Sequence, residues 1–269
     1  MITEEHLKWL APRAREDYVE AMTVDGGQET LRHFGIFESQ RRFVAFFANV
    51  MHETGGLTIY KENLNYTSVA RIRAVWPART RSKSDSYLAG LVRRPPALAE
   101  FSYGGRMGNR PGTPEQIAAG TNDAYVFAGT GPLQGTGRDH MKELAAHFGV
   151  DLDEHMEYME SAHFTLMLSC LEWYQGGCNE MADAGNFDGT CAKINTGSAT
   201  NIRGTNGLDD RRRWKGRVQT LLGQKPGIME LPAALLEEPN PEGDTVPGQI
   251  ANWTETDEEF VGLNTTAVA

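Results

Sequence analysis

The chain has 269 residues, 40% of them hydrophobic, so it is long enough to bury a core and is not disordered throughout. Its net charge of −10 is unevenly placed, because residues 226–269 contain nine acidic residues and no Lys or Arg. Residues 1–225 therefore hold all 26 basic residues and 27 of the 36 acidic ones. A body so close to neutral lacks the basic stripe that nucleic acid binding requires.

The first half of the chain contains one strong helix pattern. Thr3 is a candidate N-cap for a first helix, which we expect to extend to about residues 18–22. "QRRFVAFFANVMHE" (40–53) places its apolar residues at helical spacing from Phe43 to Met51, which predicts an amphipathic helix. Residues 95–137 are rich in Gly, Pro, Asn and Thr, and we expect an irregular binding surface there.

Three further helices are predicted in the second half. "RDHMKELAAHFGV" (138–150) predicts a helix that stops at Gly149, and "DDRRRWKGRVQTLLG" (209–223) predicts a last amphipathic helix. Between them, "ESAHFTLMLSCLEWYQGG" (160–177) is apolar nearly all round, which is typical of a central buried helix. The body is therefore expected to be mainly α-helical.

The last part of the chain differs from the rest in composition. Residues 226–269 contain five prolines, many acids and no pattern of helix length, which is typical of a linker or docking arm. We expect one domain over 1–225 followed by this extension. The charged N-terminal residues have no apolar run of signal-peptide length, and no stretch approaches the roughly 20 apolar residues of a membrane span. We therefore expect synthesis in the bacterial cytoplasm without an export signal, and no membrane insertion.

The three cysteines, Cys170, Cys178 and Cys191, have no CxxC spacing. We expect reduced, mostly buried thiols, with a Cys178–Cys191 disulfide as an open alternative. The nearby histidines lack the spacing of zinc ligands, so no metal site is expected.

Two glutamates, Glu53 and Glu62, flank the Gly55-Gly56 break in "HETGGLTIYKENLNY" (52–66). Glu53 is expected at the edge of the apolar stripe in the last turn of its helix, where desolvation and the helix dipole favour the neutral acid. Glu62 lies in a polar stretch beside Lys61, which favours the carboxylate. Such a pair is suited to general acid and base catalysis of glycoside hydrolysis.

Spacing alone is weak support for this interpretation, because glutamates nine positions apart are common. His52-Glu53 begins like the zinc-protease motif HExxH, but position 56 is glycine, so that alternative fails. His52 by itself is more often a packed or supporting residue than a metal ligand.

The motifs together resemble glycoside hydrolase family 19, which comprises chitinases and phage endolysins. "FFANVMHETGG" followed by "YKENLNY" is similar to its catalytic signature, and the endolysin branch is the nearest match. The likeness continues through four further motifs in the order of the family, over about residues 1–222: "GRMGN" (105–109), "GTGPLQGTGR" (129–138), "MADAGNFDGTCAKINTG" (181–197) and "NGLDDRRRWKGRV" (206–218).

This resemblance implies a lysozyme-like, two-lobed helical domain with a substrate cleft. It implies that Glu53 is the general acid and Glu62 the base in an inverting reaction, with carboxyls about 6.5–9.5 Å apart. Thr136 matches the hydroxyl that holds the catalytic water.

The resemblance also implies supporting and substrate-binding residues, either as hydrogen-bond partners of the sugar or as anchors of the glutamates. They are His52, Asn63, Tyr66, Gln134, Asn195 and Arg211. For Thr136, Asn195 and Arg211, a turn residue, a helix cap and a solvated helix face are the alternatives.

The sequence departs from the family pattern at the cleft wall. "GTGPLQGTG" has Thr130 in place of an arginine and Gly135 in place of an apolar residue, and residues 198–205 are additional. These departures bear on substrate affinity and rate more than on reaction type.

The resemblance implies a cofactor-free glycosidase that cleaves β-1,4 bonds of peptidoglycan, as an endolysin or a virion-associated lysin. The implied bond is the one that a muramidase cuts. The acidic extension 226–269 suggests docking to a phage tail or tail-like particle, so that the enzyme acts on the cell wall during entry. A chitinase, and a catalytically degenerate glycan-binding or structural component, remain alternatives.

Overall fold

The computed structural model describes residues 1–229, and the extension expected over 226–269 lies outside the described residues from Glu230 onward. The described part is helical and contains no strand, only the isolated bridges Lys61–Thr130 and Thr130–Gly135. None of its helices is long and apolar enough to cross a membrane. The expected mainly α-helical fold is confirmed.

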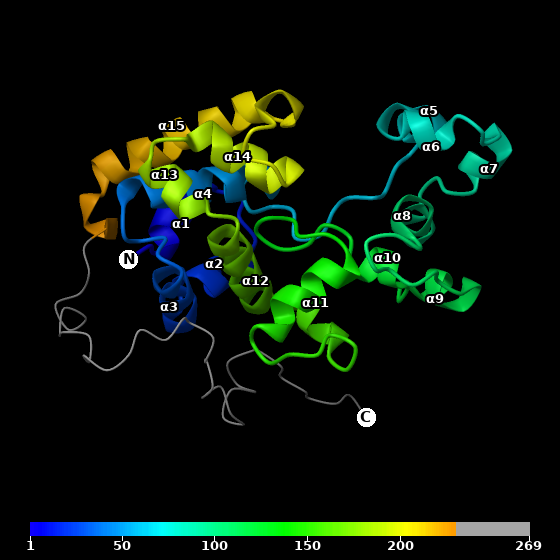
Figure 1. Cartoon of the computed structure of the whole chain (residues 1–269), viewed down its shortest axis with the longest axis horizontal. Helices are drawn as coiled ribbons and strands as arrows, with labels where there is room; N and C mark the ends of the chain where they lie inside the picture. Colours follow the sequence, from blue (N-terminus) through cyan, green and yellow to red (C-terminus); the bar gives the residue numbers. More distant parts are fainter. Residues whose placement is uncertain (230–269) are drawn as a thin grey trace.

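The large lobe is built from the two ends of the described chain (Figure 1). Its helices are α1 (Glu4–Leu10), α2 (Glu16–Thr23), α3 (Asp25–His33), α4 (Gln40–Glu53), α11 (Arg138–Ala146), α12 (Ala162–Gln175), α13 (Cys178–Asp183), α14 (Phe187–Thr196) and α15 (Leu208–Gln224), with short 3-10 turns η1 (Met156–Glu160), η2 (Ile202–Gly204) and η3 (Pro226–Met229).

Two helices form the centre of this lobe. As expected, α12 is buried on nearly all sides, and Trp173 on it meets Phe46 on α4 edge to face with ring centroids 5.4 Å apart. The aromatic residues Phe43, Phe46 and Phe47 of α4 are fully buried. The long helix α15 packs along α4, so the helix that carries Glu53 is covered on both sides.

The small lobe stands apart from the large one and has its own apolar core (Figure 1). Its helices are α5 (Val69–Val75), α6 (Pro77–Thr80), α7 (Asp85–Ala89), α8 (Pro95–Tyr103), α9 (Pro114–Ala119) and α10 (Asp123–Val126). Leu64, Ile72, Leu88 and Leu98 are buried between these helices. Part of the segment expected to be irregular is thus helical, because Pro95, Pro114 and the Thr113 cap begin helices there.

Two more expectations on element bounds need correction. Thr3 caps α1 through a capping box with His6, as expected. The helix ends at Leu10 instead of reaching residues 18–22, because Pro12 interrupts it, and α2 begins at Glu16. At the other end, Ile228 is buried in the core of the large lobe, so residues 226–229 pack with the body rather than beginning a separate arm.

All three cysteines are free and buried, in line with reduced thiols rather than a Cys178–Cys191 disulfide. Burial raises the pKa of Cys178 to about 12 and that of Cys191 to about 11. These thiols are therefore inert packing groups rather than nucleophiles.

Candidate active site

Glu53 is the last residue of α4, and the following glycines turn the chain away from the helix. Gly55 and Gly56 have φ of +57° and +74°, and the N–H of Gly56 donates to the carbonyl of Met51 at 2.7 Å. This is the left-handed termination that glycine favours, and it satisfies carbonyls left open at the helix end. A Cβ at position 56 would come within 3.4 Å of the Trp214 ring, so the turn is also closely packed.

The partner of Glu53 is Arg211, which is fully buried on α15. Its Nη2 donates to Glu53 Oε1 at 2.5 Å and its Nη1 to Asn49 Oδ1 at 2.6 Å. The expected surroundings of Glu53 were apolar, whereas the structure also places a guanidinium in direct contact with it. Arg211 anchors a glutamate and is not exposed to a sugar.

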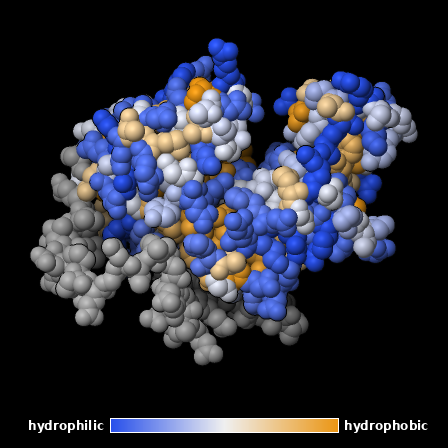
Figure 2. Space-filling view, in the orientation of Figure 1, coloured by the Kyte–Doolittle hydropathy of each residue, from blue (hydrophilic) through white to orange (hydrophobic). Residues whose placement is uncertain are grey.

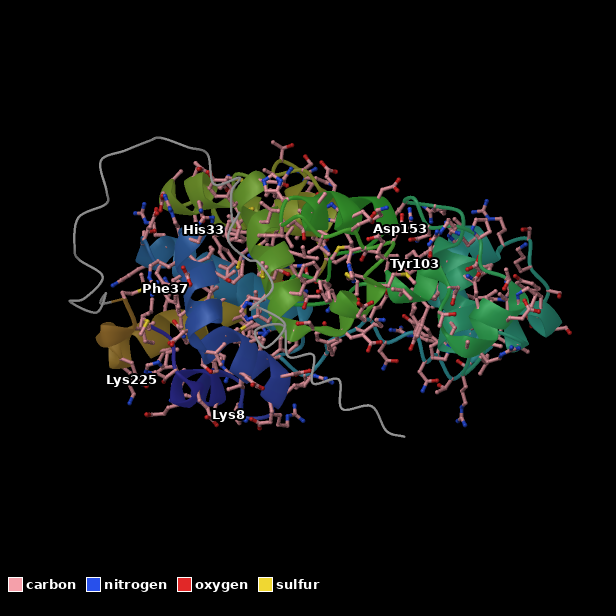
Figure 3. The ribbon with its side chains drawn as sticks, turned by 90° about the horizontal axis from the view of Figure 1, so that it is seen from below. Lys8, His33, Phe37, Tyr103, Asp153 and Lys225 are labelled. Carbon is pink, nitrogen blue, oxygen red and sulfur yellow. The ribbon has the colours of Figure 1, made fainter. Side chains whose placement is uncertain are left out.

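Glu62 lies where the chain crosses from the large to the small lobe. Its N–H donates to the carbonyl of Gly129 at 2.7 Å, beside the antiparallel bridge Lys61–Thr130. The hydroxyl of Tyr103 donates to both carboxylate oxygens, at 3.1 and 2.9 Å. Figure 3 shows Tyr103 at the boundary between the lobes.

Burial raises the pKa of Glu62, and the hydrogen bond from Tyr103 opposes this shift without cancelling it. The polar, cation-supported environment expected for Glu62 is therefore not what the structure shows. Lys61 lies over the ring of Tyr125, with Nζ 5.0 Å from its centroid, and burial lowers its own pKa. The adjacent cation is thus directed at a ring rather than at the carboxylate.

A cleft of about 740 Å³ lies beside Glu53. Four of the residues expected in the site line it together: Glu53, Gln134, Thr136 and Asn195. The face in Figure 2 is hollowed between the two lobes, with mostly hydrophilic residues at its rim. Glu62, His52, Asn63, Tyr66 and Arg211 are not among the lining residues.

Gln134 and Thr136 brace the turn that forms one wall of the cleft. The Gln134 amide nitrogen donates to the carbonyls of Tyr60, at 3.1 Å, and Gly131, at 2.8 Å. The Thr136 hydroxyl donates to the carbonyl of Gln134 at 2.9 Å. In the free protein both side chains are thus held by backbone, and the Glu62 segment is tied to this turn through Tyr60.

Asn195 and His52 hold the start of α15. Asn195 Oδ1 accepts from the N–H of Asn206 at 2.8 Å, and His52 Nδ1 lies 2.7 Å from Asp210 Oδ2. Both contacts lie at or just before the start of α15, the helix that carries Arg211.

Asn63 and Tyr66 lie on the side of the small lobe. Asn63 is exposed, and its Oδ1 accepts from the N–H of Asn65 at 2.9 Å. Tyr66 packs edge to face on Trp76, with centroids 5.2 Å apart. Burial, and then the charge of Glu62, raise the pKa of Tyr66, which places its hydroxyl in the field of that carboxylate.

Four residues of the site were not found from the sequence: Tyr103, His140, Glu172 and Lys193. Tyr103 lies 41 residues from Glu62, and no spacing rule joins them. Glu172 did carry a signal, since it is the one carboxylate within the apolar helix α12. No group of three or more His, Cys, Asp or Glu side chains within residues 1–229 is arranged to hold a metal ion.

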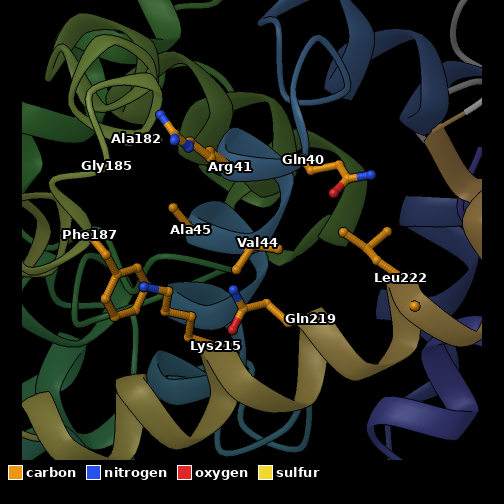
Figure 4. A pocket seen from close by; sticks show the side chains of 11 residues that line it. Gln40, Arg41, Val44, Ala45, Ala182, Gly185, Phe187, Lys215, Gln219 and Leu222 are labelled. Atoms are coloured by element: carbon orange, nitrogen blue, oxygen red, sulfur yellow. The ribbon is translucent and has the colours of Figure 1, made fainter.

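A second hollow of about 540 Å³ lies between α4, α13, α14 and α15 (Figure 4). Val44, Ala45 and Phe187 line it, with Arg41 and Lys215 at its edge, and the Lys215 ammonium lies 4.8 Å from the Phe187 centroid. Within residues 1–229, no carboxylate lines this hollow. It offers no acid or base for hydrolysis, so the cleft at Glu53 is the candidate active site.

Comparison with known proteins supports the resemblance seen in the motifs. The chain is 27% identical over 169 residues to a glycosyl hydrolase family 19 domain-containing protein of Haemophilus influenzae, covering 62% of this chain and 72% of that protein. No family model matches the chain. The resemblance to glycoside hydrolase family 19 is confirmed by this relative.

The fold is similar to that of chitinase C from Streptomyces griseus. The crystal structure of that enzyme superposes with a TM-score of 0.51 at 17% identity, covering 82% of this chain and 76% of the other. At this identity the likeness concerns the fold.

Proposed function

We propose that this protein is a glycoside hydrolase that cleaves β-1,4 bonds in the glycan strands of bacterial peptidoglycan, with Glu53 and Glu62 as its catalytic carboxyls. The observation that supports the proposal is the cleft beside Glu53, with Glu62 on the segment that crosses between the lobes and each carboxyl held by its own partner. Arg211 holds Glu53 and Tyr103 holds Glu62. The family 19 relative supports the glycosidase class.

In the proposed mechanism Glu53 protonates the leaving oxygen and Glu62 activates a water, with inversion at the anomeric carbon. As the glycan fills the cleft, it would exclude water from around Glu53 and its partner Arg211. Thr136 would help to hold the attacking water after leaving its bond to Gln134.

The surroundings of the two glutamates suggest a second assignment, in which Glu62 is the acid and Glu53 is the base. Burial raises the pKa of Glu62, and the guanidinium of Arg211 contacts Glu53. Azide replaces a missing base in an inverting enzyme by attacking the anomeric carbon. Rescue of Glu62→Gln alone supports Glu62 as the base, and rescue of Glu53→Gln alone supports the second assignment.

The proposal predicts that Glu53→Gln and Glu62→Gln each lower hydrolysis of purified peptidoglycan by roughly 10²–10⁴-fold, because each removes a proton-transfer group. The assay is zymography followed by turnover of soluble strands, with the exposed Glu154→Gln as the matched control. Equal turnover by wild type and both variants would reject the enzymatic proposal and leave a glycan-binding or structural role.

Substrate and bond are tested on the same protein. Mass spectrometry of digested peptidoglycan shows which sugar carries the new reducing end, and muramic acid there identifies a muramidase. The fold similarity to chitinase C favours chitin as the alternative substrate. Faster cleavage of colloidal chitin than of peptidoglycan would establish that alternative.

A further inference from the structure

Three ionisable side chains in the cleft have no part in the proposed mechanism. They are His140 on α11, Glu172 on α12 and Lys193 on α14, and they line the same cavity as Glu53. Three separate helices thus direct charged groups toward one wall. In an enzyme whose two glutamates suffice for hydrolysis, such groups are available to bind substrate.

His140 and Glu172 form an ion pair. Nε2 of His140 lies 3.3 Å from Oε1 of Glu172, and the two side chains are 40% and 23% exposed. The hydrogen bond to Glu172 raises the pKa of His140, so the imidazolium persists to higher pH than in an isolated histidine. The pair is polar but nearly neutral, because one charge offsets the other.

Lys193 is a cation without such an offset. Within residues 1–229 it forms no ion pair, and its Nζ donates only to the carbonyl of Gly197, at 3.3 Å. Glu53, the other carboxylate on the cleft wall, is already paired with Arg211. The wall therefore presents one uncompensated positive charge to whatever occupies the cleft.

Gly135, one of the departures from the family pattern, lies at this same wall. A Cβ there would meet Met141 Sδ at 2.7 Å and Glu172 Oε2 at 3.7 Å. A larger residue at position 135 would push into Met141 and narrow the cavity beside Glu172. The glycine at position 135 therefore keeps the cavity open beside Glu172.

We infer that Lys193, with the His140–Glu172 pair beside it, forms an anion subsite that binds carboxylate groups on the glycan strand. This inference rests on the proposed function and makes its substrate class more specific. Each muramic acid bears a lactyl ether whose carboxyl group is a free carboxylate where no peptide is attached. Where a peptide is attached, that carboxyl is an amide and the peptide bears carboxylates of its own. Chitin has no such group. Lys193 would donate a charge-assisted hydrogen bond to the carboxylate, and Glu172 would orient His140 as a second donor.

The test compares two forms of one substrate. Glycan strands freed of their peptides carry lactyl carboxylates, and coupling of those carboxyls to ammonia gives neutral strands of the same length. Wild type is expected to cleave the carboxylated strands with a kcat/KM about tenfold higher, since a hydrogen bond to a charged group contributes about this factor. The preference should shrink at high salt. Equal rates on the two strands would overturn the inference.

Variants locate the effect. In Lys193→Met the ratio of the two kcat/KM values should fall toward one, while Lys193→Arg should keep most of it. Lys215→Met, which removes a lysine from the other hollow, is the matched control and should leave the ratio unchanged. Because both kcat/KM values come from the same preparation, a smaller fraction of folded protein lowers both equally and leaves their ratio unchanged. Failure of wild type to cleave either strand would count against the proposed function instead, whereas cleavage without preference counts against the subsite alone.

Discussion

The position of the Glu53 carboxyl depends on one residue, Arg211, through its buried guanidinium. It contacts Glu53 and Asn49 at once and is fully buried. Removing one member of a buried pair leaves an uncompensated charge, which is why such changes are costly while exposed ion pairs contribute little.

Arg211→Met should therefore lower the free energy of unfolding by about 3 kcal/mol, because the Glu53 carboxylate and the Asn49 amide lose their partner. Urea denaturation measures this. The control is Arg213→Met, two residues along the same helix, whose side chain is 72% exposed and pairs with Asp210. We expect less than about 1 kcal/mol there. Similar losses in both variants would contradict the anchoring role of Arg211.

The hydroxyl of Tyr103 controls the charge on Glu62. Because its hydrogen bond lowers the pKa of Glu62, Tyr103→Phe should raise that pKa further. If Glu62 is the base, the low-pH limb of the kcat/KM profile should move to higher pH, since the carboxylate forms later as pH rises. Tyr87→Phe, an exposed tyrosine of the small lobe, is the control. An unmoved limb would argue against Glu62 as the titrating base.

At the scale of elements, the glycine turn that follows α4 fixes the direction of the Glu53 side chain. Gly56→Ala should destabilise the protein by about 1–2 kcal/mol, because φ is +74° there and a Cβ approaches Trp214. Gly216→Ala, in the exposed middle of α15 with open space around it, should instead stabilise by about 0.5–1 kcal/mol. Thermal unfolding of the two variants checks both signs, and a loss in both would mean that helix propensity is not the governing factor.

Elements with a long apolar repeat could be predicted from the sequence. Helices α4, α12 and α15 were foreseen because 14 to 17 residues of regular spacing give a clear pattern. A two-lobed domain was expected from the resemblance, but the helices of the small lobe were not predicted. They run from 4 to 9 residues and are begun by caps such as Ser68 and Ser84 rather than by a repeat. The sequence contained the capping residues of these helices. It did not show the apolar core whose packing makes such short helices stable.

The site was foreseen in part for the same reason. Glu53 and Glu62 are close in sequence and share one motif, and Gln134, Thr136 and Asn195 lie with Glu53 in the cleft. Tyr103 and Arg211 act on the glutamates from 41 and 158 residues away. Such contacts depend on helix packing, so neither the burial of Arg211 nor the raised pKa of Glu62 could be derived from local composition.

At the scale of the whole molecule, residues 1–229 form two cores joined near the candidate site. Charged groups also bridge the lobes: Arg110 Nη2 lies 3.7 Å from Asp153 Oδ1, and Arg138 Nε lies 3.3 Å from Asp123 Oδ2. The alignment of Glu53 and Glu62 is therefore a property of the assembled lobes.

We propose that the acidic extension serves as a docking arm for a phage tail or tail-like particle. Deletion of residues 230–269 should leave the free energy of unfolding and the hydrolysis of soluble strands unchanged, and should abolish association with particles in co-sedimentation. The cut falls after Met229 because Ile228 belongs to the core of the large lobe. Ile228→Ala in the full chain is the control: it should lower stability by about 2–5 kcal/mol while keeping association. Particle association of the shortened chain would remove the docking role.

The chain enters and leaves the small lobe through neighbouring antiparallel segments. Gly131 N–H donates to the carbonyl of Tyr60 at 2.9 Å, and Glu62 N–H to that of Gly129. The first and last residues of the small lobe thus lie side by side, an arrangement that tolerates insertion or exchange of the segment between them. A lobe grafted there from a relative would replace Tyr103 while leaving Arg211 untouched. Recombination at these two ends would therefore change the surroundings of Glu62 and leave those of Glu53 as they are.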